Sequence, residues 1–124
     1  MTTAELTHRI NAFRDERDWA QFHNPKDMAV SVCIEAAELL EHFQWKTPAE
    51  CDAHVRARRE DIADEIADVA IYLFELADLL GIPIDQAMLS KLEKNAQKYP
   101  VSLARGSNLK YTQHHQRPTG ESNT

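Results

Sequence analysis

The chain has 124 residues, of which 43% are hydrophobic and 27% are charged, and its formal net charge is −6. This length favours one domain with a core of its own. The excess of 20 acidic residues over 14 Lys plus Arg argues against DNA or RNA as the main partner, because such binding depends on basic side chains that neutralise phosphates. A small anionic ligand held through a metal ion is compatible with this charge.

No membrane span or secretory signal is expected in the sequence. The longest unbroken apolar run, 69–74, is far shorter than the roughly 20 residues that cross a bilayer. The N-terminal segment is amphipathic and mixed in charge, and Cys33 and Cys51 form neither a CxxC motif nor a disulfide framework. We therefore expect a cytoplasmic protein that does not associate with membranes.

Four main helices with short connections are predicted from apolar residues at helical spacing and from capping residues. Their expected ranges are about 4–18, 27–45, 54–80 and 84–98. The T-x-x-E pattern of Thr2 and Glu5 caps the first helix, and Asn24-Pro25 marks the break before the second. No strand pattern and no internal repeat is present, so the fold class is all-α, a four-helix bundle.

The longest predicted helix, 54–80, has clear boundaries and an unusually wide apolar arc. Thr47-Pro48 with Glu50 has the pattern of a fresh helix start, interpreted as one short turn before this helix. Gly81 is the expected residue after its C-cap, and Pro83 prevents its continuation. Apolar residues cover well over half of its circumference, which suits a helix at the centre of a bundle or between two subunits.

The composition becomes polar from residue 101 onward, with few large apolar groups. Such a segment buries too little to order itself alone. We expect a domain over 1–111 and a flexible tail over 112–124, and the basic residues in 104–111 suggest a segment that folds over bound phosphates.

Acidic side chains gather on the two longest predicted helices. Segment 60–78 carries seven acidic residues and no Lys or Arg, although like charges three or four residues apart destabilise a helix by about a few tenths of a kcal/mol per pair. Two acidic pairs have the same spacing of three residues: Glu35 with Glu38, and Glu65 with Asp68. Facing one another, they would form a pocket of oxygen ligands.

A divalent cation would resolve the repulsion within such a pocket. Mg²⁺ and Mn²⁺ prefer carboxylate oxygens, whereas zinc prefers His and Cys. The alternative is an ordinary solvated helix face. The lack of interleaved basic residues that could pair with the acids argues against this alternative. Asp61 is a candidate for the outer shell of the site, and Glu75, on the same stripe, is left without a role.

Two other classes of protein were weighed against a magnesium enzyme. A di-iron bundle uses paired Glu-x-x-His motifs, and the sequence holds only one, from Glu5 to His8. A non-catalytic helical interaction protein with an acidic stripe would bind neither Mg²⁺ nor nucleotide.

Three segments of the sequence resemble those of a known family. They are RDWAQFHNPKDMAVSVCIEAAELLEHFQW, DEIADVAIYLFELADLLGI and SKLEKNAQKYPV, which contain in order ExxE, ExxD and K-x-x-x-N-x-x-K-Y-P. In these motifs the chain resembles the all-α nucleotide pyrophosphohydrolases of the MazG-like superfamily, and within it the small dCTP pyrophosphatase type. The family's pattern departs at Ile34 and Ala37, where glycine is frequent, and at Ile10, where close relatives have a base-pocket His.

The resemblance implies Mg²⁺-dependent cleavage of nucleoside triphosphates, dCTP or a modified dNTP foremost, between the α and β phosphates. By motif position the metal ligands are Glu35, Glu38, Glu65 and Asp68. Glu35 and Glu38 are the candidates that accept a proton from the attacking water. The expected substrate contacts are Trp19 and Trp45 around the base, and Lys91, Asn95, Lys98 and Tyr99 around the phosphates and sugar. His23 is a candidate for a wall of the base pocket, with a polar loop residue as the alternative. A homodimer or homotetramer with sites shared between subunits is also implied.

Overall fold

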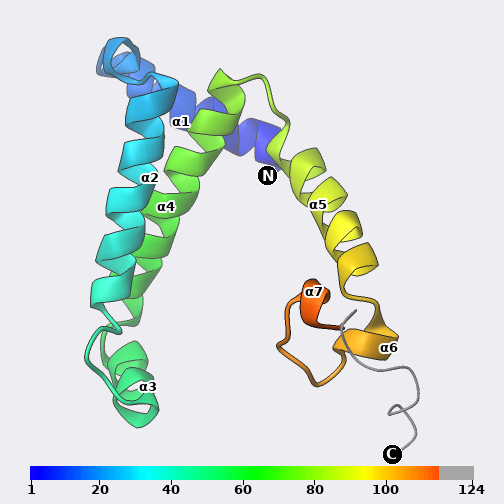
Figure 1. Ribbon diagram of the computed structural model, residues 1–124. Coiled ribbons are helices and arrows are strands. Elements are labelled where there is room, and N and C mark those ends of the chain that lie inside the picture. The colour runs from blue at the N-terminus through cyan, green and yellow to red at the C-terminus, as the bar shows by residue number, and fades with distance from the viewer. Residues whose placement is uncertain (115–124) are drawn as a thin grey trace, which may run out of the picture. The chain divides into compact units, whose positions relative to one another are not determined.

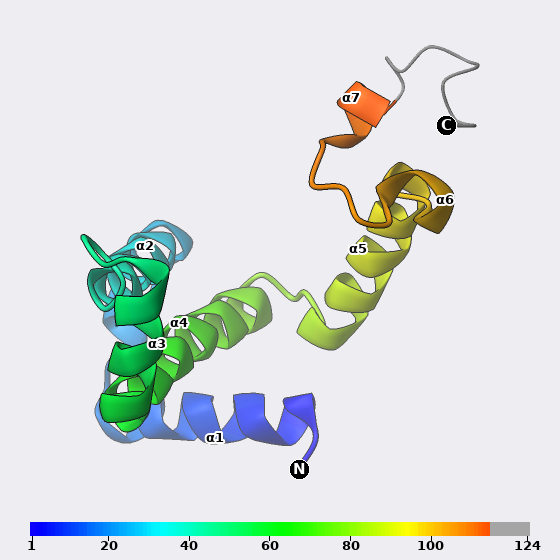
Figure 2. The ribbon, with the colours of Figure 1, turned by 90° about the horizontal axis from the view of Figure 1, so that it is seen from below.

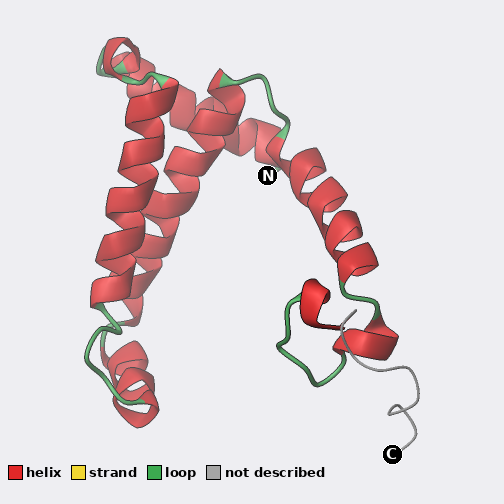
Figure 3. Cartoon of the chain, viewed as in Figure 1, coloured by secondary structure: helices red, strands yellow, loops and turns green. Residues whose placement is uncertain are grey.

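The computed structural model describes residues 1–114, and every regular element in that range is a helix (Figure 3). The predicted all-α fold class is therefore confirmed. The elements are α1 (Thr3–Glu16), η1 (Ala20–Phe22), α2 (Pro25–Glu41), α3 (Pro48–Ala57), α4 (Arg59–Leu79), α5 (Ile84–Lys98), α6 (Val101–Ala104) and α7 (Tyr111–His114). The chain forms two compact units, Met1–Ile84 and the part from Asp85 onward.

Two long antiparallel helices, α2 and α4, form the centre of the first unit (Figure 1). They lie side by side along most of their length, so that residues in the second half of α2 face residues in the first half of α4. Helix α1 also packs on α4, and Figure 2 shows it crossing the two long helices at one end. Asn11 links α1 to α4, because its Nδ2 donates a hydrogen bond to Asp78 Oδ2 at 2.8 Å.

The starts of the helices follow the capping signals in the sequence. Thr2 with Glu5 and Thr47 with Glu50 each form a complete capping box, in which the Thr hydroxyl and the Glu carboxylate satisfy two backbone N–H groups. The Asn24 side chain accepts from the N–H of Asp27, so α2 begins at Pro25, earlier than the expected residue 27.

Helix α3 is a full helix of ten residues and not the single turn that was predicted. Residues 54–57 consequently belong to α3, and α4 begins only at Arg59. The chain bends at Arg58, with φ −125° and ψ 34°, and Arg58 Nε pairs with Asp61 Oδ2 at 2.6 Å. The sequence has no Gly or Pro at this bend, which explains why the two helices were predicted as one.

Two helices end in the same reverse turn with a residue in the left-handed region. After α4 this residue is Gly81, at φ 68°, as predicted. After α1 it is Asp18, at φ 54°, whose N–H donates to Asp15 O, while the N–H of Trp19 donates to Arg14 O. These paired bonds are those of a Schellman motif, which turns the chain so that Trp19 lies back against α1.

The C-terminal part contains two short helices that the polar composition did not predict, α6 and α7. Each spans four residues. Helix α7 covers 111–114 and crosses the predicted domain boundary at residue 111, which stays a prediction. Most of the predicted flexible tail, 115–124, lies outside the described residues.

The described chain buries few apolar side chains. Its buried hydrophobic residues are Ile10, Met28 and Ile62, of which Met28 is 1% exposed. By contrast, Met88 and Leu92 of α5, which were expected to face inward, are 58% and 62% exposed. A chain of this length normally buries a larger core, so a large apolar surface is left for a partner. Over residues 1–114, no helix is both long enough and apolar enough to cross a membrane.

Substitution of Met28 by Ala should lower the free energy of unfolding by about 2–5 kcal/mol, because it leaves a cavity in a small core. Urea denaturation followed by circular dichroism measures this loss. The matched control is Met88→Ala, which removes the same side chain from an exposed position and should change stability by less than about 0.5 kcal/mol. Equal losses in the two variants would contradict the assignment of Met28 to the core.

Candidate functional site

Three carboxylates converge where the second half of α2 faces the first half of α4. Glu35 and Glu38 come from α2 and Glu65 from α4, and one ligand oxygen of each lies within 4.8 Å of the others. The spacing of three residues places the two α2 side chains on one helix face, and antiparallel packing brings α4 opposite them. The structure thus brings together three of the four predicted metal ligands.

The cluster holds carboxylate oxygens that are buried and have no hydrogen-bond partner, Glu35 Oε2 and Glu65 Oε2. Burial of an unsatisfied acceptor is costly, and more so when it carries charge. A hard divalent cation would supply the missing partner, since it prefers oxygen ligands of this kind. The donor set therefore fits Mg²⁺ or Mn²⁺ better than a metal that requires His or Cys.

The electrostatics of the cluster disfavour full ionisation. Burial, a hydrogen bond with Glu38 and the charges of Glu38, Asp68 and Glu65 raise the pKa of Glu35 to about 7 from its ordinary 4.5. Burial and the neighbouring Glu38 also raise the pKa of Glu65. The charge of Asp68 acts on both groups, so the fourth predicted ligand lies near the cluster although it is outside the three converging oxygens.

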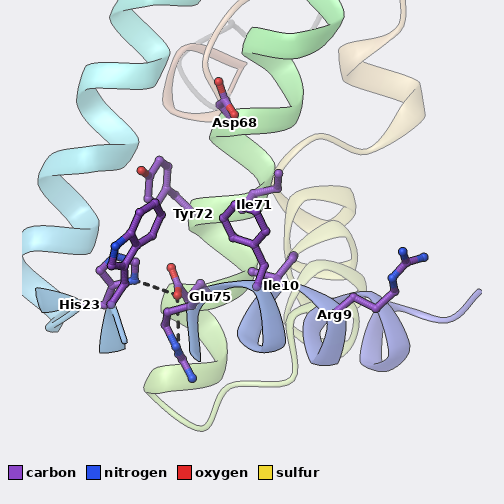
Figure 4. A pocket seen from close by; sticks show the side chains of 10 residues that line it. Arg9, Ile10, His23, Asp68, Ile71, Tyr72 and Glu75 are labelled. Atoms are coloured by element: carbon purple, nitrogen blue, oxygen red, sulfur yellow. Dashed lines mark hydrogen bonds and ion pairs between the residues drawn. The ribbon is translucent and has the colours of Figure 1, made fainter. Parts of the chain in front are cut away.

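A cavity of about 400 Å³ lies beside the carboxylates, between α1, η1 and α4. Its lining residues are Arg9, Ile10, Phe13, Arg14, Trp19, His23, Asp68, Ile71, Tyr72 and Glu75. Figure 4 shows Asp68 at one end of the cavity, Tyr72 next to it and Glu75 further along α4. Asp68 thus borders both the cavity and the carboxylate cluster. A ligand bound here can place one end among aromatic side chains and the other at the carboxylates.

Aromatic side chains form one wall of this cavity. The rings of Phe13 and Trp19 meet edge to face, with centroids 6.0 Å apart, and the His23 ring lies 6.5 Å from that of Trp19. The Arg17 guanidinium covers the Phe13 ring at 3.6 Å and donates to the Phe13 carbonyl oxygen at 2.8 Å. Such a wall offers stacking area to a planar ligand.

Glu75, to which the sequence assigned no role, is the buried charge of the cavity and only 3% exposed. Its Oε1 lies 2.9 Å from His23 Nδ1 and 3.5 Å from Arg14 Nη1. Tyr72 stands between Glu75 and Asp68 on α4, and burial together with the nearby carboxylates raises the pKa of its phenol. A signal for Glu75 existed in the sequence, because this acid interrupts the apolar run from Val69 to Ala77.

Two histidines that received no predicted role lie at the other end of the cluster. His42 Nδ1 and His54 Nε2 are 2.9 Å apart. Together with Glu38, Glu41 and Glu65 they line a second cavity of about 370 Å³. Burial and the positive charges around it lower the pKa of His54. No motif pointed to this pair, because its two members come from different helices.

The remaining predicted substrate residues come from the turn after α2 and from the second compact unit. Trp45 is 92% exposed, in the turn after α2, with φ 62°. Lys91, Asn95 and Lys98 follow one another on α5 in the second compact unit, with Tyr99 directly after them. Their roles stay predictions.

Two residues named with alternative roles are engaged elsewhere. Asp61, the outer-shell candidate, is exposed and ion-paired with Arg58. Glu5, from the single Glu-x-x-His motif, accepts the Thr2 N–H at 2.9 Å in the capping box of the exposed helix α1. The capping role of Glu5 gives no support to a di-iron centre.

Comparison with known proteins places these features in a family. The sequence pattern of the MazG-like family matches residues 30–113, a range that includes all four predicted metal ligands. A crystal structure of a pyrophosphatase from Archaeoglobus fulgidus superimposes with a TM-score of 0.75 and 45% sequence identity, covering 78% of this chain and 91% of that one.

Characterised relatives are similar over most of the chain. The protein named dCTP pyrophosphatase 1 from Rattus norvegicus is 42% identical over 113 residues, and the protein of the same name from Homo sapiens is 42% identical over 114. These matches cover 89% and 90% of this chain. They span about two-thirds of the relatives, 66% of the rat protein and 67% of the human one.

Mg²⁺ should raise the melting temperature more at about pH 8 than at about pH 6. A carboxyl with a raised pKa stabilises the fold fully below its unfolded value of 4.5, and this contribution is lost as the pH rises through about 7. Metal binding requires the deprotonated form, so Mg²⁺ restores most stability where the metal-free protein has lost it. Thermal melts in EDTA and in Mg²⁺ at both pH values measure the effect.

The control pair for this measurement is Glu35→Gln against Glu60→Gln. The first variant removes the buried acid and should show a small Mg²⁺ shift at both pH values. The second removes an exposed acid of α4 and should behave as the wild type. A Mg²⁺ shift that is independent of pH in the wild-type protein would contradict the assignment.

Proposed function

The chain belongs to the MazG-like family, and on this basis we propose that it hydrolyses nucleoside triphosphates to a monophosphate and pyrophosphate, with dCTP or a modified deoxynucleotide as substrate. The observation that carries the proposal is the junction at Asp68, where a carboxylate cluster with unsatisfied oxygens meets a cavity walled by aromatic rings. A nucleotide matches this arrangement, because it has a planar base for the aromatic cavity at one end and a chain of phosphates for the carboxylate cluster at the other.

The phosphate end would be held through the carboxylates. Glu35, Glu38, Glu65 and Asp68 are the proposed metal ligands, with Mg²⁺ as the expected ion and Mn²⁺ as a substitute. When bound, the ion supplies the charge that allows a polyphosphate to approach four acids, and it polarises the phosphoryl group.

Cleavage of the α–β anhydride by water needs an acceptor for one proton. Glu35 or Glu38 would take it, and the rest of the water would stay on one phosphoryl group while the bridging oxygen leaves with the other. Both residues lie on the rigid α2–α4 pair, which keeps them in position without reorganisation.

The base would occupy the cavity beside the carboxylates. Trp19 offers a ring face, His23 offers a polar edge, and Ile10 stands where close relatives were expected to have a His. Cytoplasmic localisation is proposed with this activity, because nucleotide pools are its substrate.

Residues on α5 would complete the site from the phosphate side. Lys91, Asn95 and Lys98 share one face of that helix at spacings of four and three residues, and Tyr99 follows them. Two lysines and an amide on one face suit a polyphosphate. We propose that these residues and the exposed Trp45 act at a site shared between copies of the chain.

The apolar surface of the chain supports self-association into a dimer or tetramer. The buried core is small, and a groove of about 500 Å³ runs along the exposed side of α2. Its lining is almost entirely apolar: Lys26, Ala29, Val30, Cys33, Ile34 and Ala37. A second copy of this chain is the proposed occupant, because the same copy would also cover the exposed apolar residues of α4, such as Ile66 at 53%.

Substitution of Asp68 by Asn should lower kcat/KM for dCTP by about 100-fold or more, since it removes one charge from the metal site while it keeps the shape. Release of pyrophosphate, measured with excess Mg²⁺, reports the loss. Asp64→Asn is the matched control, one helical turn away on α4 and exposed, and should stay within about twofold of wild type. Equal turnover of dCTP in EDTA and in Mg²⁺ would refute the proposed chemistry.

Substitution of Val30 by Glu should weaken self-association, because it buries a charge in the groove of α2 if a second copy covers it. Light scattering after size-exclusion chromatography gives the mass of each species at several concentrations. Val101→Glu, at an exposed position on α6 that does not line the groove, serves as the control. A wild-type protein that is monomeric at all concentrations would contradict the proposed assembly.

A further inference from the structure

A buried charged triad forms one side of the cavity next to the carboxylates. Glu75, 3% exposed, has Oε1 2.9 Å from His23 Nδ1 and 3.5 Å from Arg14 Nη1. The partner side chains are themselves mostly covered, at 19% exposure for His23 and 17% for Arg14. All three residues line the cavity, and a dashed line joins Glu75 to His23 in Figure 4.

The contact with Glu75 decides which ring nitrogen of His23 carries a proton. An ionised carboxylate only accepts hydrogen bonds, so Nδ1 must be the donor at 2.9 Å. The Arg14 guanidinium, 3.5 Å from the same Oε1, supplies a countercharge beside this buried carboxylate. Nδ1 is therefore the protonated nitrogen.

The other nitrogen, Nε2, is left with its lone pair. In a neutral imidazole one nitrogen donates and the other accepts, so an Nδ1 that donates to Glu75 leaves Nε2 as the acceptor. A further arginine, Arg9, also lines the cavity, and the remaining titratable groups on its wall are Asp68 and Tyr72. Among the described residues, Nε2 has no hydrogen-bond partner.

From this geometry we propose that Glu75 is a positioning residue that makes His23 a hydrogen-bond acceptor for the exocyclic amine of a nucleobase. The inference rests on the proposed function, because it places a base in this cavity. Cytosine and adenine carry such an amine, whereas uracil and hypoxanthine present a carbonyl oxygen at the same place. Glu75 thus sets selectivity between aminated and deaminated bases and does not touch the base itself.

The discrimination follows from the cost of an unpaired acceptor. In a largely apolar cavity, a carbonyl oxygen that faces the Nε2 lone pair leaves two acceptors opposed and both without a donor. Sites built to pair a polar group reject an analogue that lacks the donor far better than apolar contacts reject a change in size. Ile10 and Ile71 offer no donor to the deaminated base, and the side-chain donors elsewhere on the cavity wall belong to Arg9, Arg14, Trp19 and Tyr72.

The position of the triad along α4 agrees with this role. Glu75 lies seven residues after Asp68, about 10 Å along the helix axis, and on the same face. A nucleotide with its phosphates at Asp68 and the cluster would therefore have its base in the region of His23. The intervening residue on this face is Tyr72, whose phenol pKa is raised by burial and by the nearby carboxylates.

Equilibrium binding of nucleoside monophosphates tests the proposal without relying on turnover. Isothermal titration calorimetry in the presence of Mg²⁺ should show that dCMP binds at least about tenfold more tightly than dUMP if the cavity takes pyrimidines. If the cavity takes purines, dAMP should bind more tightly than dIMP by the same factor. In Glu75→Gln this ratio should fall toward one, because the amide can donate or accept and no longer fixes the ring. Asp64→Asn, the same acid-to-amide change at an exposed position of α4 that does not line the cavity, should keep the ratio.

The ring nitrogen of His23 that carries the proton gives a second readout. A merely structural role of Glu75 would leave this tautomer unchanged. In ¹⁵N-labelled wild-type protein, long-range ¹H–¹⁵N correlation spectra should show a protonated Nδ1 and an unprotonated Nε2, and Glu75→Gln should mix the two tautomers. If Glu75→Gln fails to fold, His23→Gln replaces it in the binding test with the same expected loss of ratio.

Two results would overturn the inference. One is a wild-type His23 with a protonated Nε2, and the other is a selectivity ratio that is near one in the wild type or unchanged in Glu75→Gln. Hydrolysis of dCTP by the same preparation is scored separately. A protein that binds dCMP selectively but hydrolyses no triphosphate would reject the proposed function and retain the role of Glu75.

Discussion

Mutual repulsion among carboxylates on two facing helices is the constraint on which the rest of this molecule depends. Glu35, Glu38 and Glu65 point oxygens at one another within 4.8 Å, and burial together with these neighbours raises the pKa of Glu35 to about 7. The fold tolerates this because buried apolar residues anchor each helix nearby, Met28 about two turns before Glu35 and Ile62 about one turn before Glu65. A cluster of acids with buried, unsatisfied oxygens is suited to a cation supplied from outside.

The same helix pair places the charged and the aromatic parts of the site in order along α4. Along α4 the environment changes from carboxylates at Glu65 and Asp68 to the aromatic cavity at Tyr72 and Glu75. One face of one helix therefore spans both the phosphate end and the base end of the proposed substrate. Its opposite face stays apolar and partly exposed, which is why we link catalysis to assembly in the proposed function.

Much of this arrangement could be predicted from the sequence, and the failures have physical causes. Spacing alone identified the acidic pairs, and turn chemistry located Gly81, because both are local properties. The bend at Arg58 was missed since it is held by an ion pair with Asp61 and by no Gly or Pro. The role of Glu75 depends on Arg14 and His23, which lie more than fifty residues earlier, so no local pattern could reveal it.

The attachment of α1 has a consequence for motion. This helix has one buried residue, Ile10, and is fastened to α4 by Asn11 with Asp78 and by Arg14 with Glu75. Because α1 also supplies a wall of the cavity, detachment of the helix and loss of the wall are a single subglobal opening. A ligand that binds only the closed form shifts this equilibrium toward the attached helix, so slower amide exchange in α1 reports occupancy of the cavity.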